Sequence, residues 1–237
     1  MKFLNNHPIR TTAWGVFRAV GRWPPTACLG CGAACRDGLC AACLDDLPTL
    51  PASRCAVCAM PVPSGACCGH CLAAPPAFAA THACFAYAGW LAQAIQSAKF
   101  GGRWHAFALF GRHLARTLPP PRVDAIVPVP LAADRLRERG FNQAQELAAT
   151  LARAWRLPWH AELLLRARGG AHQARSSHAA RLRNVRGAFQ APQRLDGATL
   201  LLVDDVMTSG ASLGACAKVL LKAGAARVEC CVLARTL

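Results

Sequence analysis

The chain has 237 residues, of which 54% are hydrophobic and 16% are charged, and its 27 lysines and arginines outnumber 12 aspartates and glutamates to give a net charge of +15. This length holds one large domain, or a domain of about 150 residues with a small appendage, and the composition excludes disorder as the main state. The charge favours polyanionic ligands such as phosphate-rich small molecules, nucleic acid or anionic lipid, although genomic base composition also enriches arginine.

The first stretch, residues 1–27, is predicted to be a short helical or flexible segment. Aromatic and apolar side chains recur at helical intervals from Trp14 to Trp23, and Pro24 and Pro25 then end any helix. These first residues lack the continuous apolar stretch of a secretory signal, and no part of the chain approaches about 18 uncharged apolar residues. We therefore expect a cytoplasmic protein without membrane insertion.

The second stretch, residues 28–76, is rich in cysteine, and ten of the 14 cysteines lie between Cys28 and Cys71. Eight of them form four CxxC pairs, in which two thiolates of one tight turn can reach the same tetrahedral zinc ion. Two successive pairs complete one site, so the segment is predicted to be a double zinc ribbon with two structural Zn²⁺ ions. The candidate ligands are Cys28, Cys31, Cys40 and Cys43 in the first half, and Cys55, Cys58, Cys68 and Cys71 in the second.

Two alternatives stay open in this module. Cys67 can replace Cys68 as a ligand because the two are adjacent, and the segment can also hold one ion rather than two. Four thiolates leave the metal no open position, so we expect zinc to serve folding or recognition rather than catalysis.

The third stretch, residues 84–237, alternates helical and strand patterns. Helices are predicted over 90–117, with a break at Gly101-Gly102, over 141–156 and over 211–223. Strands are predicted over 124–130, 163–165, 199–203 and 228–233. This alternation predicts an α/β fold with a parallel sheet.

The most specific segment is Leu200 to Ser212. An apolar strand delivers Asp204 and Asp205, and a short hydroxyl-rich loop with Gly210 leads directly into a helix. The backbone amides of such a loop and the positive end of the helix form a nest for a phosphate. Two carboxylates beside a phosphate need another partner, which ribose hydroxyls provide, directly or with Mg²⁺.

This segment resembles the signature of type I phosphoribosyltransferases, which bind 5-phosphoribosyl-1-pyrophosphate (PRPP). Further motifs, Val127-Pro-Val-Pro130, Arg139-Gly-Phe-Asn-Gln143, Arg181, Asn184 and Phe189, together with the double zinc ribbon, are similar to the ComF family, also called the GntX-like or DNA-utilisation family. The resemblance covers about residues 28–237. It implies a phosphoribosyltransferase domain over 84–237, PRPP with Mg²⁺ as ligand, and a role in the uptake and use of DNA in natural transformation.

The resemblance also implies roles for individual residues. Asp204 and Asp205 would hold the ribose hydroxyls, and the loop from Thr208 to Ser212 would hold the 5-phosphate. The loop after the first core strand faces the pyrophosphate, where Arg135 or Arg139 could clamp it, although a solvated helix start is the competing interpretation. The cofactor-binding set is therefore Asp204, Asp205, Met207, Thr208, Ser209, Gly210, Ala211, Ser212, Pro128, Val129, Arg135 and Arg139.

A connector without acidic residues runs between Glu162 and Asp196 and carries seven arginines. In the resembled family the matching segment is the hood that closes over PRPP, so Arg181 joins Asp204 and Asp205 as a catalytic candidate. Single-stranded DNA could use the same arginines. Lys99 and Arg103 are further candidate phosphate contacts, or else part of a solvated helix face.

The leading hypothesis is a PRPP-binding, phosphoribosyltransferase-like protein of DNA uptake, with single-stranded DNA and other DNA-uptake or recombination proteins as partners. One alternative is a non-catalytic zinc-ribbon adaptor that binds DNA or protein and is regulated by PRPP. Another is a nucleotide-salvage phosphoribosyltransferase, which is disfavoured because no base pocket can be recognised after Val232. Catalysis and binding of PRPP without catalysis are both compatible with these residues.

Overall fold

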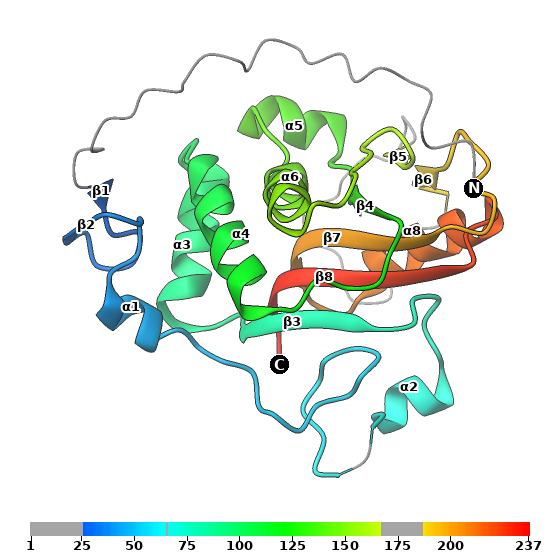
Figure 1. Cartoon of the computed structure of the whole chain (residues 1–237), viewed down its shortest axis with the longest axis horizontal. Coiled ribbons are helices and arrows are strands. Elements are labelled where there is room, and N and C mark those ends of the chain that lie inside the picture. Colours follow the sequence, from blue (N-terminus) through cyan, green and yellow to red (C-terminus); the bar gives the residue numbers. More distant parts are fainter. Residues whose placement is uncertain (1–25, 65, 167–186) are drawn as a thin grey trace.

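The computed structural model of the chain describes residues 26–64, 66–166 and 187–237. Its centre is a four-stranded parallel sheet with the strand order β3-β8-β7-β4 (Figure 1). The strands are β3 (Thr81–Ala86), β4 (Ala125–Pro128), β7 (Thr199–Met207) and β8 (Arg227–Arg235). The predicted α/β fold with a parallel sheet is confirmed.

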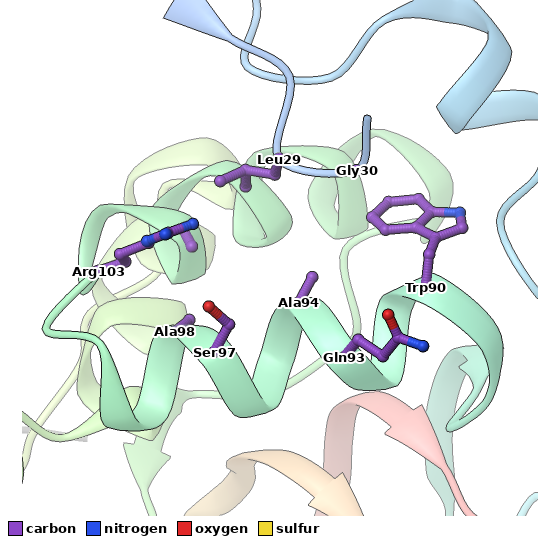
Figure 2. A pocket seen from close by; sticks show the side chains of 9 residues that line it. Leu29, Gly30, Trp90, Gln93, Ala94, Ser97, Ala98 and Arg103 are labelled. Atoms are coloured by element: carbon purple, nitrogen blue, oxygen red, sulfur yellow. The ribbon is translucent and has the colours of Figure 1, made fainter. Parts of the chain in front are cut away.

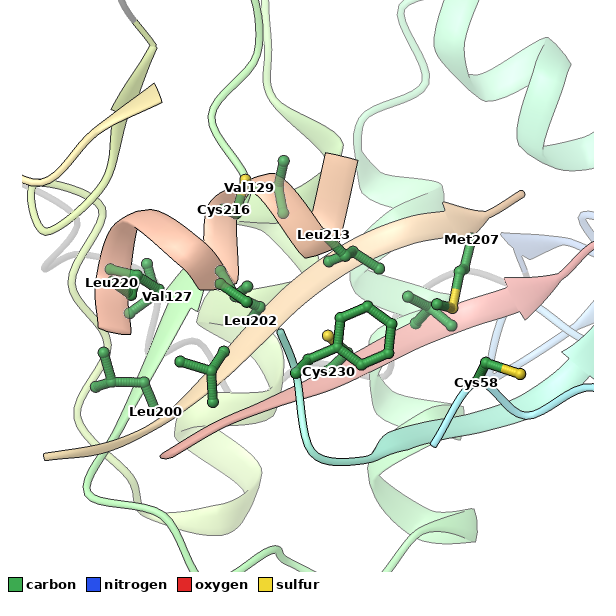
Figure 3. Packing of buried hydrophobic residues seen from close by; sticks show 14 of the residues in the cluster. Cys58, Val127, Val129, Leu200, Leu202, Met207, Leu213, Cys216, Leu220 and Cys230 are labelled. Carbon is green, nitrogen blue, oxygen red and sulfur yellow. The ribbon is translucent and has the colours of Figure 1, made fainter. Parts of the chain in front are cut away.

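Helices cover both faces of this sheet, because β7 carries an unbroken apolar sequence that must be buried on both sides. On one face, Leu200 and Leu202 pack with Leu213 and Leu220 of α8 (Ala211–Lys222) (Figure 3). On the other face, Leu201 joins residues of three helices. These helices are α3 (Gly89–Phe100), α4 (His105–Thr117) and α6 (Gln143–Trp155).

The expected helices appear near their predicted positions. The break expected at Gly101-Gly102 separates α3 from α4, and Gly102 has a φ of +66°, which suits glycine. The predicted strand over 199–203 is longer than expected, because β7 continues through the two aspartates to Met207. The helix expected within residues 1–27 lies outside the described residues.

One predicted strand is wrong in part. Leu163 and Leu164 are buried in a turn, and β5 (Leu165–Arg166) begins only after them and pairs with β6 (Phe189–Gln190) in a separate small sheet. Both leucines fill the core without pairing with another strand. Their apolar character therefore indicates burial rather than strand structure.

The strand β3 has no counterpart among the expected elements, and neither does α5 (Ala133–Arg139), which ends at Gly140 in the left-handed region with a φ of +77°. β3 is an edge strand whose partner β8 lies at the far end of the chain, so no local signal identifies it.

The cysteine-rich segment is small and forms two parts that rest on different places of the domain (Figure 1). The first contains the hairpin of β1 (Thr26–Ala27) and β2 (Ala34–Cys35) and the short helix α1 (Ala41–Asp45), and the second contains α2 (Gly69–Ala73). Leu29 and Leu44 of the first pack on the α3 and α4 side of the sheet. Cys55, Cys58 and Val62 of the second belong to the buried cluster on the α8 side.

Within residues 26–64, 66–166 and 187–237, none of the helices has both the length and the apolar character that crossing a bilayer requires.

Candidate functional site

The candidate site lies at the carboxyl end of β7. Side chains alternate along a strand, so Asp204 lies on the same face as Leu202, and Asp205 lies on the same face as Val203. Asp205 is buried, with 7% of its surface exposed, whereas Asp204 is partly buried. The Asp205 backbone N–H donates to Asp204 Oδ1 at 2.9 Å. The two carboxyl groups thus occupy opposite faces of one strand end.

Asp205 lies on the face of the sheet that α3, α4 and α6 cover, where Leu201 and Val203 belong to the buried cluster. Lys99 of α3 reaches the same place, and its Nζ forms an ion pair with the Asp205 carboxylate. The structure therefore brings Lys99 to the acidic pair rather than to a solvated helix face.

Asp204 is a weak acid for an aspartate. Burial, and then the neighbouring Asp205 charge, raises the pKa of Asp204 to about 8, although the Asp205 backbone N–H and Lys99 act in the opposite direction. In the free protein, ionising this carboxyl group near neutral pH therefore requires free energy. A cation or a set of hydroxyl donors beside it would favour the ionised form.

The loop after β7 is short and mostly exposed, and it leads into α8 through a glycine. Thr208, Ser209 and Ser212 are exposed, and Gly210 precedes α8 with a φ of +76°. A Cβ on Gly210 would also lie 2.7 Å from Met207 Cε, so both the backbone angle and the space favour glycine. At the amino end of α8, the Ala211 N–H donates to Ser209 Oγ at 3.4 Å.

The loop after β4 lies beside β7 and is held by hydrogen bonds. The Val129 N–H donates to the Val203 carbonyl at 2.9 Å, and Asn142 Nδ2 donates to the Val129 carbonyl at 3.1 Å. Asn142 Oδ1 also accepts from the Ala144 N–H at 3.0 Å, which caps α6. Asn142 thus fixes the Pro128–Val129 backbone against the start of α6, a role that the sequence analysis does not assign to it.

Arg139 of the predicted arginine clamp lies over Phe100 and interacts electrostatically with Asp205. Arg139 Cζ stacks over the Phe100 ring at 5.2 Å from its centroid. Burial, and then Arg135, lowers the pKa of Arg139, while the charge of Asp205 raises it. The charge of Arg139 therefore interacts with those of Arg135 and Asp205. Among the described residues Arg139 Nε is a buried donor without a hydrogen-bond acceptor, which makes it suitable for a ligand oxygen.

The eight predicted zinc ligands form two groups of four, and within each group the Sγ atoms all lie within 4.8 Å of one another. The Sγ atoms of Cys31 and Cys40 are 3.6 Å apart, as are those of Cys58 and Cys68. Four thiolates about 2.3 Å from one tetrahedral ion would be separated by about 3.8 Å. Both groups therefore fit zinc, and Cys68 rather than Cys67 belongs to the second.

The first cysteine of each group has an acidic thiol. Burial acts to raise the pKa of Cys28, but the backbone N–H groups of Cys31, Cys40 and Gly30 lower it to about 6. Cys55 is similar: burial again acts to raise its pKa, and backbone N–H groups that include that of Cys58 lower it to about 6. Such amides stabilise the thiolates that a metal requires.

A hollow of about 170 Å³ lies between the first cysteine group and α3 (Figure 2). Leu29 and Gly30 come from the cysteine segment, and Trp90, Ser97 and Arg103 come from the domain. Arg103 therefore lines this hollow, and none of the lining residues belongs to the loop after β7.

Comparison with known proteins places this chain in a family. The phosphoribosyl transferase domain family matches residues 109–237, which include β7, its loop and α8. The DNA utilization protein YhgH of Escherichia coli is 35% identical over 177 residues, which cover 72% of this chain and 78% of that protein. The chain belongs to the ComF family of phosphoribosyltransferase-domain proteins.

Other relatives carry competence names. Competence protein F of Haemophilus influenzae is 29% identical over 211 residues, covering 84% of this chain and 91% of that protein. Competence protein ComFC of Bacillus subtilis is 29% identical over 145 residues, covering 60% of this chain and 58% of that protein.

One solved structure is also similar to this ComF-family chain. It is glutamine PRPP amidotransferase from B. subtilis complexed with ADP and GMP, with a TM-score of 0.40 and 22% identity. The similarity covers 54% of this chain and 26% of that chain, so the match spans about a quarter of the amidotransferase.

The predicted catalytic candidate Arg181, with most of the arginine-rich connector, lies outside the described residues. Arg235 is a buried residue of the site region that the sequence analysis does not identify. An arginine at the end of an apolar strand carries no motif, so only the folded structure reveals its contacts.

Proposed function

We propose that this protein binds PRPP with Mg²⁺ at the carboxyl end of β7. The observation that carries the proposal is the arrangement of Asp204 and Asp205 directly ahead of an exposed loop that opens α8 through Gly210. The carboxylates suit ribose hydroxyls and Mg²⁺, and the loop amides suit the 5-phosphate. Arg139, whose charge interacts with that of Asp205, suits the pyrophosphate.

The chemistry supported by this arrangement is substitution at ribose C1, in which an acceptor substrate forms the new bond to C1 and pyrophosphate leaves. Mg²⁺, when bound with PRPP, supplies charge neutralisation of the pyrophosphate. The protein contributes positioning and electrostatic stabilisation, because the acceptor rather than a side chain attacks C1 in such a substitution. The names of the relatives support a role in DNA uptake or utilisation, with single-stranded DNA as a proposed partner.

A calorimetric titration of PRPP in the presence of Mg²⁺ tests the binding. We expect wild-type protein to bind, and Asp205→Asn to weaken binding by roughly 5- to 150-fold, which corresponds to about 1 to 3 kcal/mol. Asp37→Asn is the matched control because Asp37 is exposed in the first cysteine segment. Equal affinities of the two variants would remove Asp205 from the site.

A second candidate function is a non-catalytic adaptor that PRPP regulates. The two groups of four cysteines favour it, because zinc sites closed by four thiolates serve folding or recognition rather than catalysis. Pyrophosphate release from PRPP, measured with and without single-stranded DNA, separates the two functions. Release that depends on an acceptor supports a transferase, and PRPP binding without release supports the adaptor.

A further inference from the structure

Arg235, at the end of β8, is buried with 6% of its surface exposed. Its Nε donates to the Cys58 carbonyl at 2.9 Å, and its Nη1 donates to the Met207 carbonyl at 3.0 Å. The carbonyls of Thr208 and Thr236 also lie in hydrogen-bond contact with Nη1, whose two hydrogens are therefore shared among three acceptors. One guanidinium therefore joins a cysteine of the second group to the backbone that begins the anion loop.

The environment of Arg235 explains how a buried cation is tolerated. Its partners in these hydrogen bonds are backbone carbonyls, and one of them belongs to Cys58, a ligand of the second cysteine group. Four thiolates around Zn²⁺ carry a net charge of about −2, which compensates a nearby guanidinium. A filled second cysteine group thus favours the position that Arg235 occupies.

A second contact links the same two places. Thr81 Oγ1 donates to the Val57 carbonyl at 2.6 Å and lies 3.9 Å from Met207 Sδ. Val57 stands between the ligands Cys55 and Cys58, so a metal that fixes this turn also fixes the carbonyls of Val57 and Cys58. Cys58 and Met207 accordingly belong to one buried cluster (Figure 3).

The carbonyls that Arg235 holds determine where the loop amides point. A trans peptide unit is planar, with its C=O and N–H directed to opposite sides. When Arg235 draws the carbonyls of Met207 and Thr208 inward, the N–H groups of Thr208 and Ser209 are directed away from it. Those two amides belong to the proposed phosphate site.

We propose that Arg235 is a positioning residue through which metal at the second cysteine group orders the anion loop. As far as it concerns phosphate, this inference rests on the proposed function. The first cysteine group is an internal control, because it contacts α3 and α4 through Gly30 with Trp90 and Gly38 with Leu109. Its metal should not affect the loop.

The test compares Cys71→Ser with Cys43→Ser in the full chain, since each removes the last ligand of one group. Zinc per chain is measured first, and each variant should lose about one ion. The Thr236 amide then reports on the connection, because it donates to the Met207 carbonyl at 3.0 Å. We expect its hydrogen exchange to be at least about tenfold faster in Cys71→Ser and within about twofold of wild type in Cys43→Ser.

Two results would overturn the proposal. One is equal Thr236 exchange in the two variants. The other is an equal acceleration across Thr236 and the central β8 amides of Cys71→Ser, because that would report loss of the domain rather than of one connection.

Arg235→Lys tests the residue itself, with Arg227→Lys as a control on the same strand, where Arg227 pairs with Glu229 at the surface. We expect Arg235→Lys to retain both zinc ions and to accelerate hydrogen exchange of the Thr236 amide. Arg227→Lys should leave this exchange unchanged. Adding Cys71→Ser to it should produce little further acceleration, because both changes break one connection. Fully additive effects would contradict transmission through Arg235.

PRPP titrations separate this inference from the proposed function. Weakening of PRPP binding by about tenfold or more in Cys71→Ser, but not in Cys43→Ser, supports both. Wild-type protein that does not bind PRPP would refute the proposed function, while the exchange results would still decide the connection between the metal group and the loop.

Discussion

Replacing Asp204 with asparagine should stabilise the free protein, and the gain should increase with pH. The pKa of Asp204 is raised from an ordinary value of 3.8 to about 8, chiefly by burial and then by Asp205. Between these two values the folded protein holds a proton that the unfolded chain has released. Stability contributed by this group is complete below about pH 4 and is lost as pH rises through about 8.

The size of the effect follows from the shift. Each pKa unit corresponds to about 1.4 kcal/mol. The free energy of unfolding of wild type should therefore fall by at most roughly 3 kcal/mol between about pH 6 and about pH 9, because the loss ends once Asp204 has ionised near pH 8. Asp204 retains some contact with solvent, which reduces this to about 1 to 2 kcal/mol. Asn cannot ionise. The free energy of unfolding of Asp204→Asn should therefore increase by this amount, relative to that of wild type, from the lower pH to the higher.

Urea unfolding at these two pH values measures the difference directly. Titrating groups remote from Asp204 are shared by the two proteins and cancel in the comparison. Asp37→Asn, at an exposed position, serves as the matched control. If the free-energy difference between Asp204→Asn and wild type is the same at both pH values, the raised pKa is wrong.

Three further predictions concern the structure around the site. Purified protein should contain about two zinc ions, and Cys28→Ser should retain about one by metal analysis, whereas metal-free folded protein would refute both sites. Lys99→Met should lower the free energy of unfolding by about 1 to 3 kcal/mol because it leaves the buried Asp205 unpaired, and unchanged urea unfolding would contradict the ion pair. Asn142→Ala should cost about 1 kcal/mol or more, since it removes the cap of α6 and the bond to Val129, which thermal and urea unfolding would detect.

The local parts of the site could be predicted because their residues are consecutive. An apolar strand, two aspartates, a small hydroxyl loop and a helix follow one another between Leu200 and Ser212, and each step constrains the next through backbone geometry. The same holds for the CxxC turns, whose two thiolates are close before any tertiary structure forms. Both features are confirmed in the structure as a strand–loop–helix unit and two groups of four cysteines.

The contacts between these units depend on the tertiary structure. Lys99 meets Asp205 because α3 packs against the face of the sheet on which Asp205 lies, although periodicity alone assigns Lys99 equally well to a solvated face. β3 likewise has no local signal, since its identity as a strand depends on pairing with β8.

The sequence by itself determined the chemistry available to this protein: thiolates in pairs, adjacent carboxylates and a glycine that opens a helix. Only the tertiary structure decided which of these groups act together. Arg235 and Cys58 are separated by 177 positions, yet they share a hydrogen bond in the core. Burial makes that pairing necessary, because a guanidinium removed from water must find acceptors wherever the folded chain places them.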